Sequence, residues 1–264
     1  ATIWKERFLI IQDINIALKG FLKIPEQNEI KGLTGALHLG RAYCYTYLVT
    51  HFCKPYNAAT AATDLGLPLF TEGTLKNFPP RSSVKDTYAF ILSDIAQAET
   101  LLASETGEEG ADTFTIDAVK ALKARVLLYQ NDWAQAYQVA EQLIATGHYP
   151  LASSATAFEK IWTEDSNTEN ITQLYAAISA GVSEISNNTN DLYLSEQESY
   201  FMPGQIEASP NVLPTQDFVD LFEANDWRKD VFLKSVDIGF FSLYAVNKYP
   251  RNEKLEPANS VFFY

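Results

Sequence analysis

The chain has 264 residues, of which 47% are apolar and 20% charged, and its formal net charge at pH 7 is -13. A chain of this length and composition buries its own core, so neither a disordered protein nor a disulfide-dependent fold is expected. The acidic balance argues against a nucleic-acid partner, because phosphate binding needs clustered Lys and Arg.

Apolar residues recur at three- and four-residue steps from Trp4 to Leu22 and predict the first helix. A second helix is expected from about Leu33 to Phe52. Its apolar stripe carries small and aromatic residues: Ala36, Gly40, Tyr43, Cys44 and Tyr47. Cys44 and Cys53 are nine positions apart, roughly 13 Å along a helix, which is too far for a disulfide. Both cysteines are therefore expected to be buried free thiols on this helix.

A long structured loop is predicted from Pro55 to Pro80, where Pro, Gly, Asn and Thr occur without helical periodicity. The sequence Ser83-Val-Lys-Asp86 has the pattern of a capping box and opens a third helix that runs to about Leu102.

Two further helices follow back to back, joined by a turn at Asn131-Asp132 and stopped by Gly147. Their stripes are Ile116, Val119, Leu122, Val126 and Tyr129, then Trp133, Ala136, Tyr137, Ala140, Leu143 and Ile144. The pair resembles a tetratricopeptide unit, and the second and third helices form another candidate unit split by the long loop.

The pattern changes after about Leu151, where Ser, Asn and Thr clusters alternate with short apolar runs. One short helix is predicted after Thr215, and alternation at Val236, Ile238 and Phe240 predicts a strand. The expected fold is mainly α: tetratricopeptide-like helical pairs over residues 1–151, with a loop-rich region of short strands and helices over 152–264 packed on them as one unit.

No catalytic or metal-binding motif is apparent. The three histidines, His38, His51 and His148, are expected in core or helix-capping roles. No HExxH, CxxC or phosphate-binding glycine loop occurs. The acidic clusters Glu105–Glu109 and Glu164-Asp165 lie in polar turns, where solvated carboxylates are expected rather than a glycosidase pair. We therefore expect a protein that is not an enzyme and that uses no cofactor and no metal.

Six motifs in order resemble the SusD/RagB family of nutrient-binding outer-membrane lipoproteins of the Bacteroidetes. They are Trp4-x3-Phe8-x2-Ile11-x3-Asn15, Gly40-Arg41-Ala42-Tyr43-Cys44-Tyr45, Leu67-Pro68-Leu69, the run from Arg81 to Ile95, the run from Ala118 to Leu151, and Pro214–Phe218 with Asn225-Asp226-x-Arg228. Most of these residues serve structure; Arg41 and Arg125, for example, are expected to hold buried or capping hydrogen bonds. Family members usually continue into further helical pairs, so the resemblance implies a shortened relative or an amino-terminal portion.

The resemblance implies a cell-surface protein that binds a glycan, or in some members peptides, and passes it to a SusC-like TonB-dependent transporter. It implies a surface-exposed lipoprotein of the outer membrane. No lipid-carrying Cys stands at the amino terminus, and no signal peptide precedes the first helix, so we expect a trimmed mature chain.

Sugar rings present flat C–H faces and many hydroxyls, so a glycan site needs exposed aromatic rings with amide or charged groups at their edges. The candidate ligand-binding residues in irregular or terminal segments are Trp4, Tyr56, Asn57, Tyr193, Tyr200, Phe201 and Gln205. The alternative function is a tetratricopeptide-type scaffold that binds a protein or peptide partner.

Overall fold

The computed structural model describes residues 2–73, 79–163, 166–175, 213–237, 242–246 and 260–263. The chain divides into two compact units, residues 1–149 and 150–264. The described part is dominated by helices with a few short strands, as the mainly α prediction requires. The expectation that the two regions pack as one unit stays a prediction.

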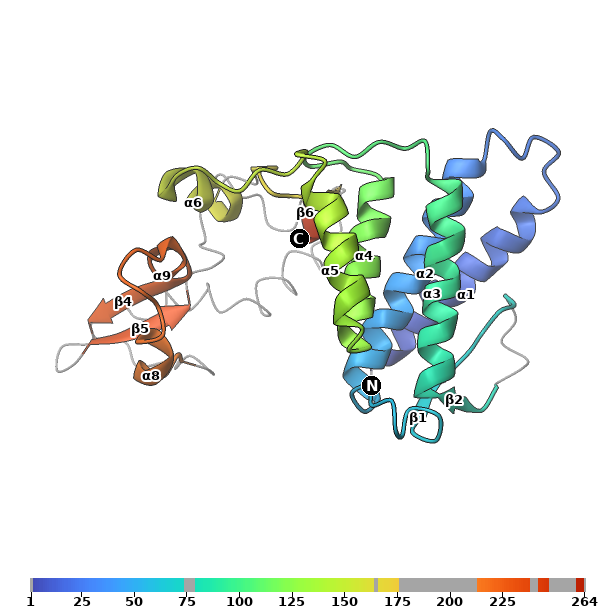
Figure 1. Ribbon diagram of the computed structural model, residues 1–264, viewed down its shortest axis with the longest axis horizontal. Helices are drawn as coiled ribbons and strands as arrows, with labels where there is room; N and C mark the ends of the chain where they lie inside the picture. The colour runs from blue at the N-terminus through green and yellow to red at the C-terminus, as the bar shows by residue number, and fades with distance from the viewer. Residues whose placement is uncertain are drawn as a thin grey trace, which may run out of the picture. The chain divides into compact units, whose positions relative to one another are not determined.

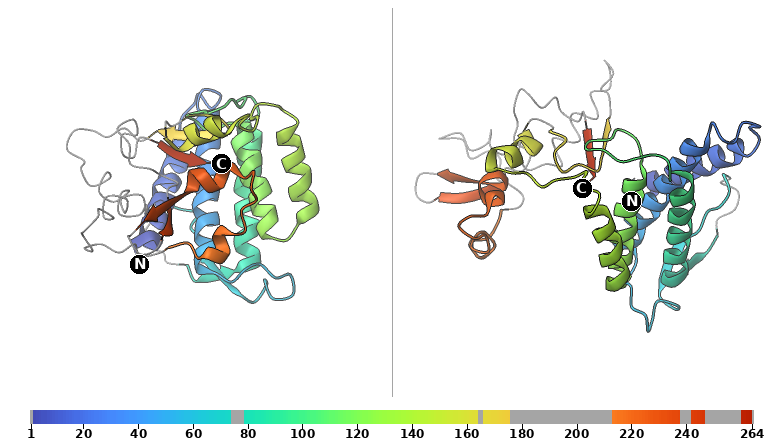
Figure 2. Two further views of the ribbon diagram at one scale, coloured as in Figure 1. Left: turned by 90° about the vertical axis from the view of Figure 1, so that its left-hand side faces the viewer. Right: turned by 45° about the horizontal axis from the view of Figure 1, so that its top comes forward.

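The first unit is a stack of five helices with one small two-stranded sheet (Figure 1). Its elements are α1 (Thr2–Phe21), α2 (Lys31–Phe52), β1 (Leu65–Pro68), β2 (Arg81–Ser83), α3 (Val84–Leu101), α4 (Ile116–Tyr129) and α5 (Trp133–Ile144). Consecutive helices in this order are packing neighbours. Two further views show α4 and α5 side by side at one side of α3 (Figure 2).

Helix α2 forms the centre of this unit, because α1 and α3 both pack on it and α4 also reaches it. Its buried residues are Gly35, Leu39, Arg41, Ala42, Cys44, Tyr45, Thr46, Leu48 and Val49. The predicted stripe describes only part of the buried surface of α2: Cys44 is buried and Tyr43 and Tyr47 are half-buried, whereas the fully buried face runs through Leu39 and Val49. Each fully buried large apolar side chain stabilises the fold by about 1.5–3 kcal/mol.

Close packing of α2 on α3 depends on Gly35. A Cβ at this position would lie 2.7 Å from Leu102 Cγ and 3.0 Å from Leu101 Cβ, so no larger residue fits without displacement. At Gly40 the same atom would make ordinary contacts with Ile14 and Phe114. Gly35 is therefore the small residue that allows α2 and α3 to pack closely.

The cysteine prediction is confirmed for Cys44, which is a buried free thiol. Cys53 is also free, but it follows the last residue of α2 and is only half-buried. Leu22 likewise falls just after α1 and is exposed, although it was placed on the first helical stripe.

Side-chain caps begin three of these helices, as local sequence chemistry predicts. The Ser83 hydroxyl accepts from the Asp86 amide at the start of α3, and its own proton goes to the Asp86 carboxylate at 2.7 Å. Thr115 caps α4 and Asp132 caps α5 in the same way. Asn131 has a φ of 61°, which makes the tight turn between α4 and α5, and Gly147 with a φ of 69° follows α5.

The second unit contains short elements, and each pair of strands is antiparallel. They are α6 (Ala155–Thr163), β3 (Thr172–Tyr175), α8 (Gln216–Val219), α9 (Trp227–Phe232), β4 (Leu233–Asp237), β5 (Ser242–Val246) and β6 (Ser260–Phe263). β3 pairs with β6, and β4 pairs with β5. A small core joins α6 to α9 through Ile161, Trp162 and Val231.

The predicted helix after Thr215 is confirmed, with the Thr215 hydroxyl accepting from the Phe218 amide. The predicted strand is found as β4, which contains Val236, whereas Ile238 and Phe240 lie outside the described residues. Helix α6 was not predicted; its apolar residues follow a Ser-rich turn. No helix among the described residues is long and apolar enough to cross a bilayer.

Candidate functional site

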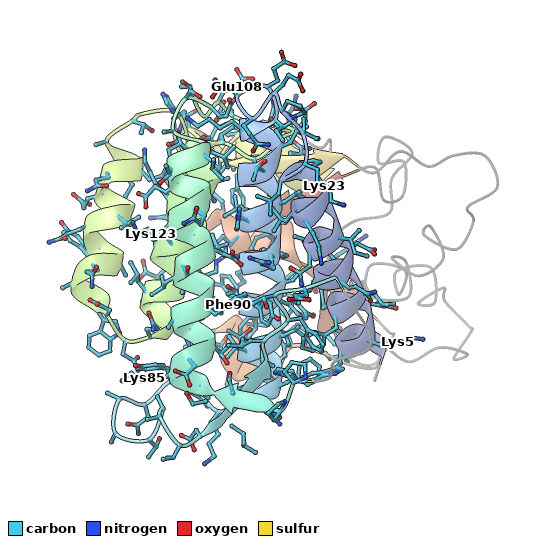
Figure 3. All side chains as sticks on the ribbon, turned by 90° about the vertical axis from the view of Figure 1, so that its right-hand side faces the viewer. Lys5, Lys23, Lys85, Phe90, Glu108 and Lys123 are labelled. Atoms are coloured by element: carbon cyan, nitrogen blue, oxygen red, sulfur yellow. The ribbon has the colours of Figure 1, made fainter. Side chains whose placement is uncertain are left out.

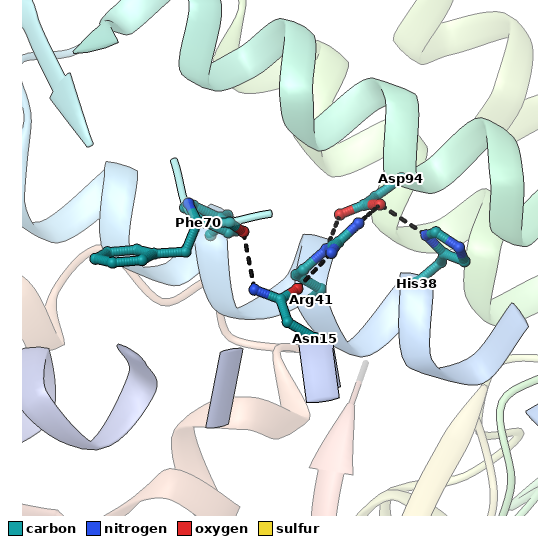
Figure 4. Close-up of polar contacts among 6 residues, drawn as sticks. Asn15, His38, Arg41, Phe70 and Asp94 are labelled. Atoms are coloured by element: carbon teal, nitrogen blue, oxygen red, sulfur yellow. Dashed lines mark hydrogen bonds and ion pairs between the residues drawn. The ribbon is translucent and has the colours of Figure 1, made fainter. Parts of the chain in front are cut away.

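A buried ion pair between Arg41 and Asp94 links α2 to α3 (Figure 4). The Arg41 guanidinium donates to both carboxylate oxygens of Asp94, from Nη2 at 2.7 Å and from Nε at 2.8 Å. His38 Nδ1 lies 2.8 Å from the same carboxylate. The three side chains join α2 to α3. The expected core role of His38 and the buried hydrogen bonds of Arg41 are thereby confirmed, whereas Arg125 lies at an exposed position.

The same network reaches the loop through Asn15 on α1. Arg41 Nη1 donates to the Asn15 side-chain oxygen, and Asn15 Nδ2 donates to the Phe70 carbonyl at 3.0 Å. Tyr45 binds this segment too, because its hydroxyl accepts from the Phe70 amide at 2.8 Å and donates to the Pro68 carbonyl. The loop after β1 is therefore fixed to α1 and α2 by buried polar groups.

Phe90, labelled in Figure 3, shields this network. The Arg41 guanidinium lies 5.2 Å from its ring centroid, and the Tyr45 ring meets it edge-on at 5.1 Å. Burial tends to raise the pKa of Asp94, but the hydrogen bonds from Arg41 and His38 outweigh this and lower it. Asp94 is thus an ionised structural group, committed to Arg41, and is not available as an acid or base.

The start of the long loop is ordered by local hydrogen bonds. The Asn57 side chain accepts from the Ala59 amide, and its carbonyl accepts from the amides of Thr60 and Ala61. Lys54 pairs with Asp64 at 2.8 Å and closes the base of this turn. Asn57 is exposed, and its side-chain oxygen is used within the turn.

Tyr56 lies half-buried beside this turn. Its ring meets that of Tyr88 edge-on with 5.3 Å between centroids, and its carbonyl accepts from Asn131 Nδ2 at 3.0 Å. Burial raises the pKa of Tyr88 to about 12, with smaller contributions from Cys53, Tyr129 and Tyr56. The loop therefore lies against the turn between α4 and α5, seventy-five residues away in sequence.

Trp4 is part of a different aromatic group, at the start of α1. Its ring contacts Phe8 at 4.8 Å and Phe52 at 5.1 Å between centroids, and it is half-buried. No contact joins Trp4 to Tyr56 or Asn57 among the interactions of the described residues. Tyr193, Tyr200, Phe201 and Gln205 lie outside the described residues. Of the three candidates that the structure describes, Tyr56 and Asn57 lie together as sequence neighbours, and Trp4 lies in a separate aromatic group.

Three aromatic side chains near the α4–α5 turn are exposed, although the sequence pattern placed them on apolar helical stripes. Tyr129, Trp133 and Tyr137 were assigned to helical stripes, but all three are exposed, as is Ile144. Only Ala136 of α5 is buried. An available signal was the Trp133-x3-Tyr137 spacing, which places two rings one helical turn apart on a face that also carries Ala140 and Ile144.

A second polar cluster surrounds Asp117 near the start of α4. Its carboxylate lies 2.8 Å from His148 Nδ1 and 3.0 Å from Lys120 Nζ, and it accepts from the Tyr149 hydroxyl at 3.3 Å. Burial opposes ionisation of Asp117, yet the hydrogen bonds from His148 and Lys120 lower its pKa. Burial raises the pKa of Tyr149, which makes its hydroxyl a poor nucleophile. The cluster fastens the segment after α5 to α4.

No group of three or more His, Cys, Asp or Glu side chains with metal-binding geometry occurs in the parts of the chain that the structure describes. Glu164 and Asp165 lie outside those parts. The described sites therefore offer aromatic rings and amides rather than a reactive constellation.

Residues 1–128 match the family model SusD-like_3, described as starch-binding and associating with the outer membrane. SusD-like protein P38 of Formosa agariphila is 26% identical over 166 residues, which is 61% of this chain and 30% of that protein. A SusD superfamily protein from Bacteroides vulgatus has a similar structure, with a TM-score of 0.76 at 20% identity, over 98% of this chain and 58% of that one.

A structure named laminarin binding SusD-like protein gives a TM-score of 0.70 at 19% identity, over 99% of this chain and 62% of that one. The chain thus spans less than two thirds of the length of these relatives. At these sequence identities the similarity to solved structures shows the fold alone. The family model matches the sequence from α1 into α4. Residues 1–128 thus match the SusD-like family model in sequence, and nearly the whole chain is similar in fold to a SusD superfamily structure.

Proposed function

We propose that the protein binds a glycan at the cell surface for uptake through a SusC-like TonB-dependent transporter. The observation that supports this most is the match of residues 1–128 to a family whose description names starch binding and the outer membrane, not a reaction. One structural relative is named for binding laminarin. In this proposal the protein is a surface-exposed lipoprotein of the outer membrane.

The described residues supply suitable chemistry for a sugar. Tyr56 offers a half-exposed ring, and Asn57 beside it offers an amide on a turn held by its own hydrogen bonds. A rigid loop loses little conformational entropy on binding, which favours affinity. In our proposal these two residues contact the glycan, Trp4 contributes from a separate position, and Tyr193, Tyr200, Phe201 and Gln205 remain predicted contacts.

The alternative, a helical scaffold for a protein or peptide partner, is favoured by one observation. Helix α1 exposes four aliphatic side chains: Ile3, Leu9, Ile10 and Ile16. Aliphatic surface is typical of protein contacts, whereas sugars prefer aromatic rings. A transporter contact through α1 would combine both functions in one chain.

Affinity electrophoresis in gels that contain soluble starch, laminarin or polygalacturonate tests glycan binding, with calorimetry on any polysaccharide that retards the protein. Retardation by a polysaccharide, but not in a gel without one, is the expected result. Migration unchanged in every gel, with no heat of binding, would reject the proposal and leave the protein-scaffold alternative.

A further inference from the structure

An arginine without an acidic partner lies where the start of α1 meets the end of α2. Arg7 is half-buried, and its guanidinium carbon lies 4.8 Å from the centroid of the Tyr47 ring. Arg41, in the same unit, is paired with Asp94 at 2.7 Å, but in the described part of the chain Arg7 takes part in no ion pair. A guanidinium has five N–H donors, so Arg7 keeps donors for a ligand.

The Tyr47 ring is covered on both faces. His51 stacks on it with 4.1 Å between centroids and 15° between the planes, so Arg7 occupies the opposite face. His51 Nδ1 lies 2.8 Å from the Tyr47 carbonyl, which holds the imidazole in place. A ring covered on both faces cannot stack on a sugar. The Tyr47 hydroxyl, which makes no hydrogen bond among the described residues, is the group left for a ligand.

The position of Arg7 is fixed from the helix beneath it. Burial raises the pKa of the Cys44 thiol, although the charge of Arg7 and its hydrogen bond to this thiol act in the opposite sense. Burial likewise raises the pKa of Tyr43, against the charges of Arg7 and Arg125. Two cations thus act at one point of α2 in a chain whose net charge is -13. Because salt screens exposed charges beyond about 8 Å, a ligand here responds mainly to these nearby cations.

We propose that Arg7 and Tyr47 bind an anionic group of a glycan, either the carboxylate of a uronic acid or a sulfate ester. The guanidinium fork supplies parallel N–H donors to two oxygens of such a group, and the Tyr47 hydroxyl adds another donor. Trp4 precedes Arg7 by three residues on α1, so it is next to Arg7 on the helix surface and contacts the sugar that carries the charge. This inference rests on the proposed glycan binding, which it deepens by naming a charged ligand class and the residues that recognise the charge.

The test compares variants of the full chain that each remove one group. Arg7→Gln removes the guanidinium charge. Lys5→Gln, the matched control, removes the same charge from an exposed residue two positions away on α1. Tyr47→Phe removes only the hydroxyl and keeps the ring between Arg7 and His51. Calorimetry is run with polygalacturonate as the carboxylate probe, dextran sulfate as the sulfate probe and laminarin as a neutral glycan.

Arg7→Gln should weaken binding of one of the two anionic polysaccharides about tenfold, or about 1.4 kcal/mol, since charge-assisted hydrogen bonds are the strong ones. Tyr47→Phe should weaken it about threefold, and Lys5→Gln by less than about twofold because its charge is screened. The polysaccharide that shows the loss identifies the anionic group. Any laminarin affinity should be the same in all variants.

Equal affinities of Arg7→Gln and Lys5→Gln for both anionic probes would overturn this inference while leaving glycan binding intact. A native chain that binds laminarin alone, or an equal loss of laminarin affinity in Arg7→Gln, would do the same. A native chain that binds no polysaccharide would overturn both proposals.

Discussion

The Arg41–Asp94 pair provides the sharpest test of the structural argument. Asp94→Asn removes one charge and leaves the Arg41 guanidinium with a neutral partner in the core, where the two side chains are 9% and 5% exposed. Breaking a buried ion pair from one side costs about 3–5 kcal/mol, because the remaining charge stays desolvated. That is a large share of the 5–15 kcal/mol that stabilises a typical domain.

Glu99→Gln is the matched control. Glu99 pairs with Lys123 at 2.7 Å, but the two side chains are 40% and 30% exposed, so solvent screens the interaction. We expect a loss of at most about 1 kcal/mol. Both carboxylates lie on α3 and both substitutions are isosteric, so the difference between the variants reports burial.

Hydrogen exchange of α2 and α3 amides is the appropriate assay, because the chain has two units and a whole-chain signal would mix them. The Arg41→Met/Asp94→Leu double variant should be less destabilised than Asp94→Asn, since no charge remains buried. Equal protection in Asp94→Asn and Glu99→Gln would refute the reasoning.

The effect should also depend on pH. The pKa of Asp94 is lower in the folded protein than its ordinary value, so its ionisation stabilises the fold fully above the unfolded pKa of about 3.9. That stabilisation is lost as the pH falls through the lower, folded value. The difference between native chain and Asp94→Asn should therefore be constant from pH 5 to 7 and shrink below about pH 4.

Other changes test single structural features. Gly66→Ala should destabilise the first unit by more than about 2 kcal/mol in urea unfolding, because its Cβ would lie 2.3 Å from both the Ser83 carbonyl and the Thr87 hydroxyl. Gly40→Ala, the control, should have little effect, and equal unfolding midpoints for the two variants would contradict the geometry. Ser83→Ala should lose about 1 kcal/mol with the α3 cap, measured in the same way, and an unchanged midpoint would show that the cap contributes nothing. Tyr56→Ala should weaken binding of a retarding polysaccharide about fivefold in calorimetry while Tyr56→Phe, which keeps the ring, should not; equal affinities would remove Tyr56 from the site.

Local sequence patterns were sufficient for much of the helical architecture. The Ser83 and Thr215 caps, the Asn131-Asp132 turn and the Gly147 stop all occur where side-chain chemistry predicts them. These signals act within about four residues, so they do not depend on the rest of the fold. The motif order likewise predicted the SusD-like resemblance that the family match supports.

Only the tertiary structure decided which faces are buried. Periodicity places Tyr47, Trp133 and Tyr137 on one side of their own helices, but it does not say how many neighbours cover that side. Helix α2 is surrounded and buries a polar residue, Arg41, because Asp94 lies opposite on α3, fifty-three residues away. Helix α5 packs on α4, and its aromatic rings Trp133 and Tyr137 are left exposed. Burial and charge pairing depend on contacts between distant segments, which no local pattern contains.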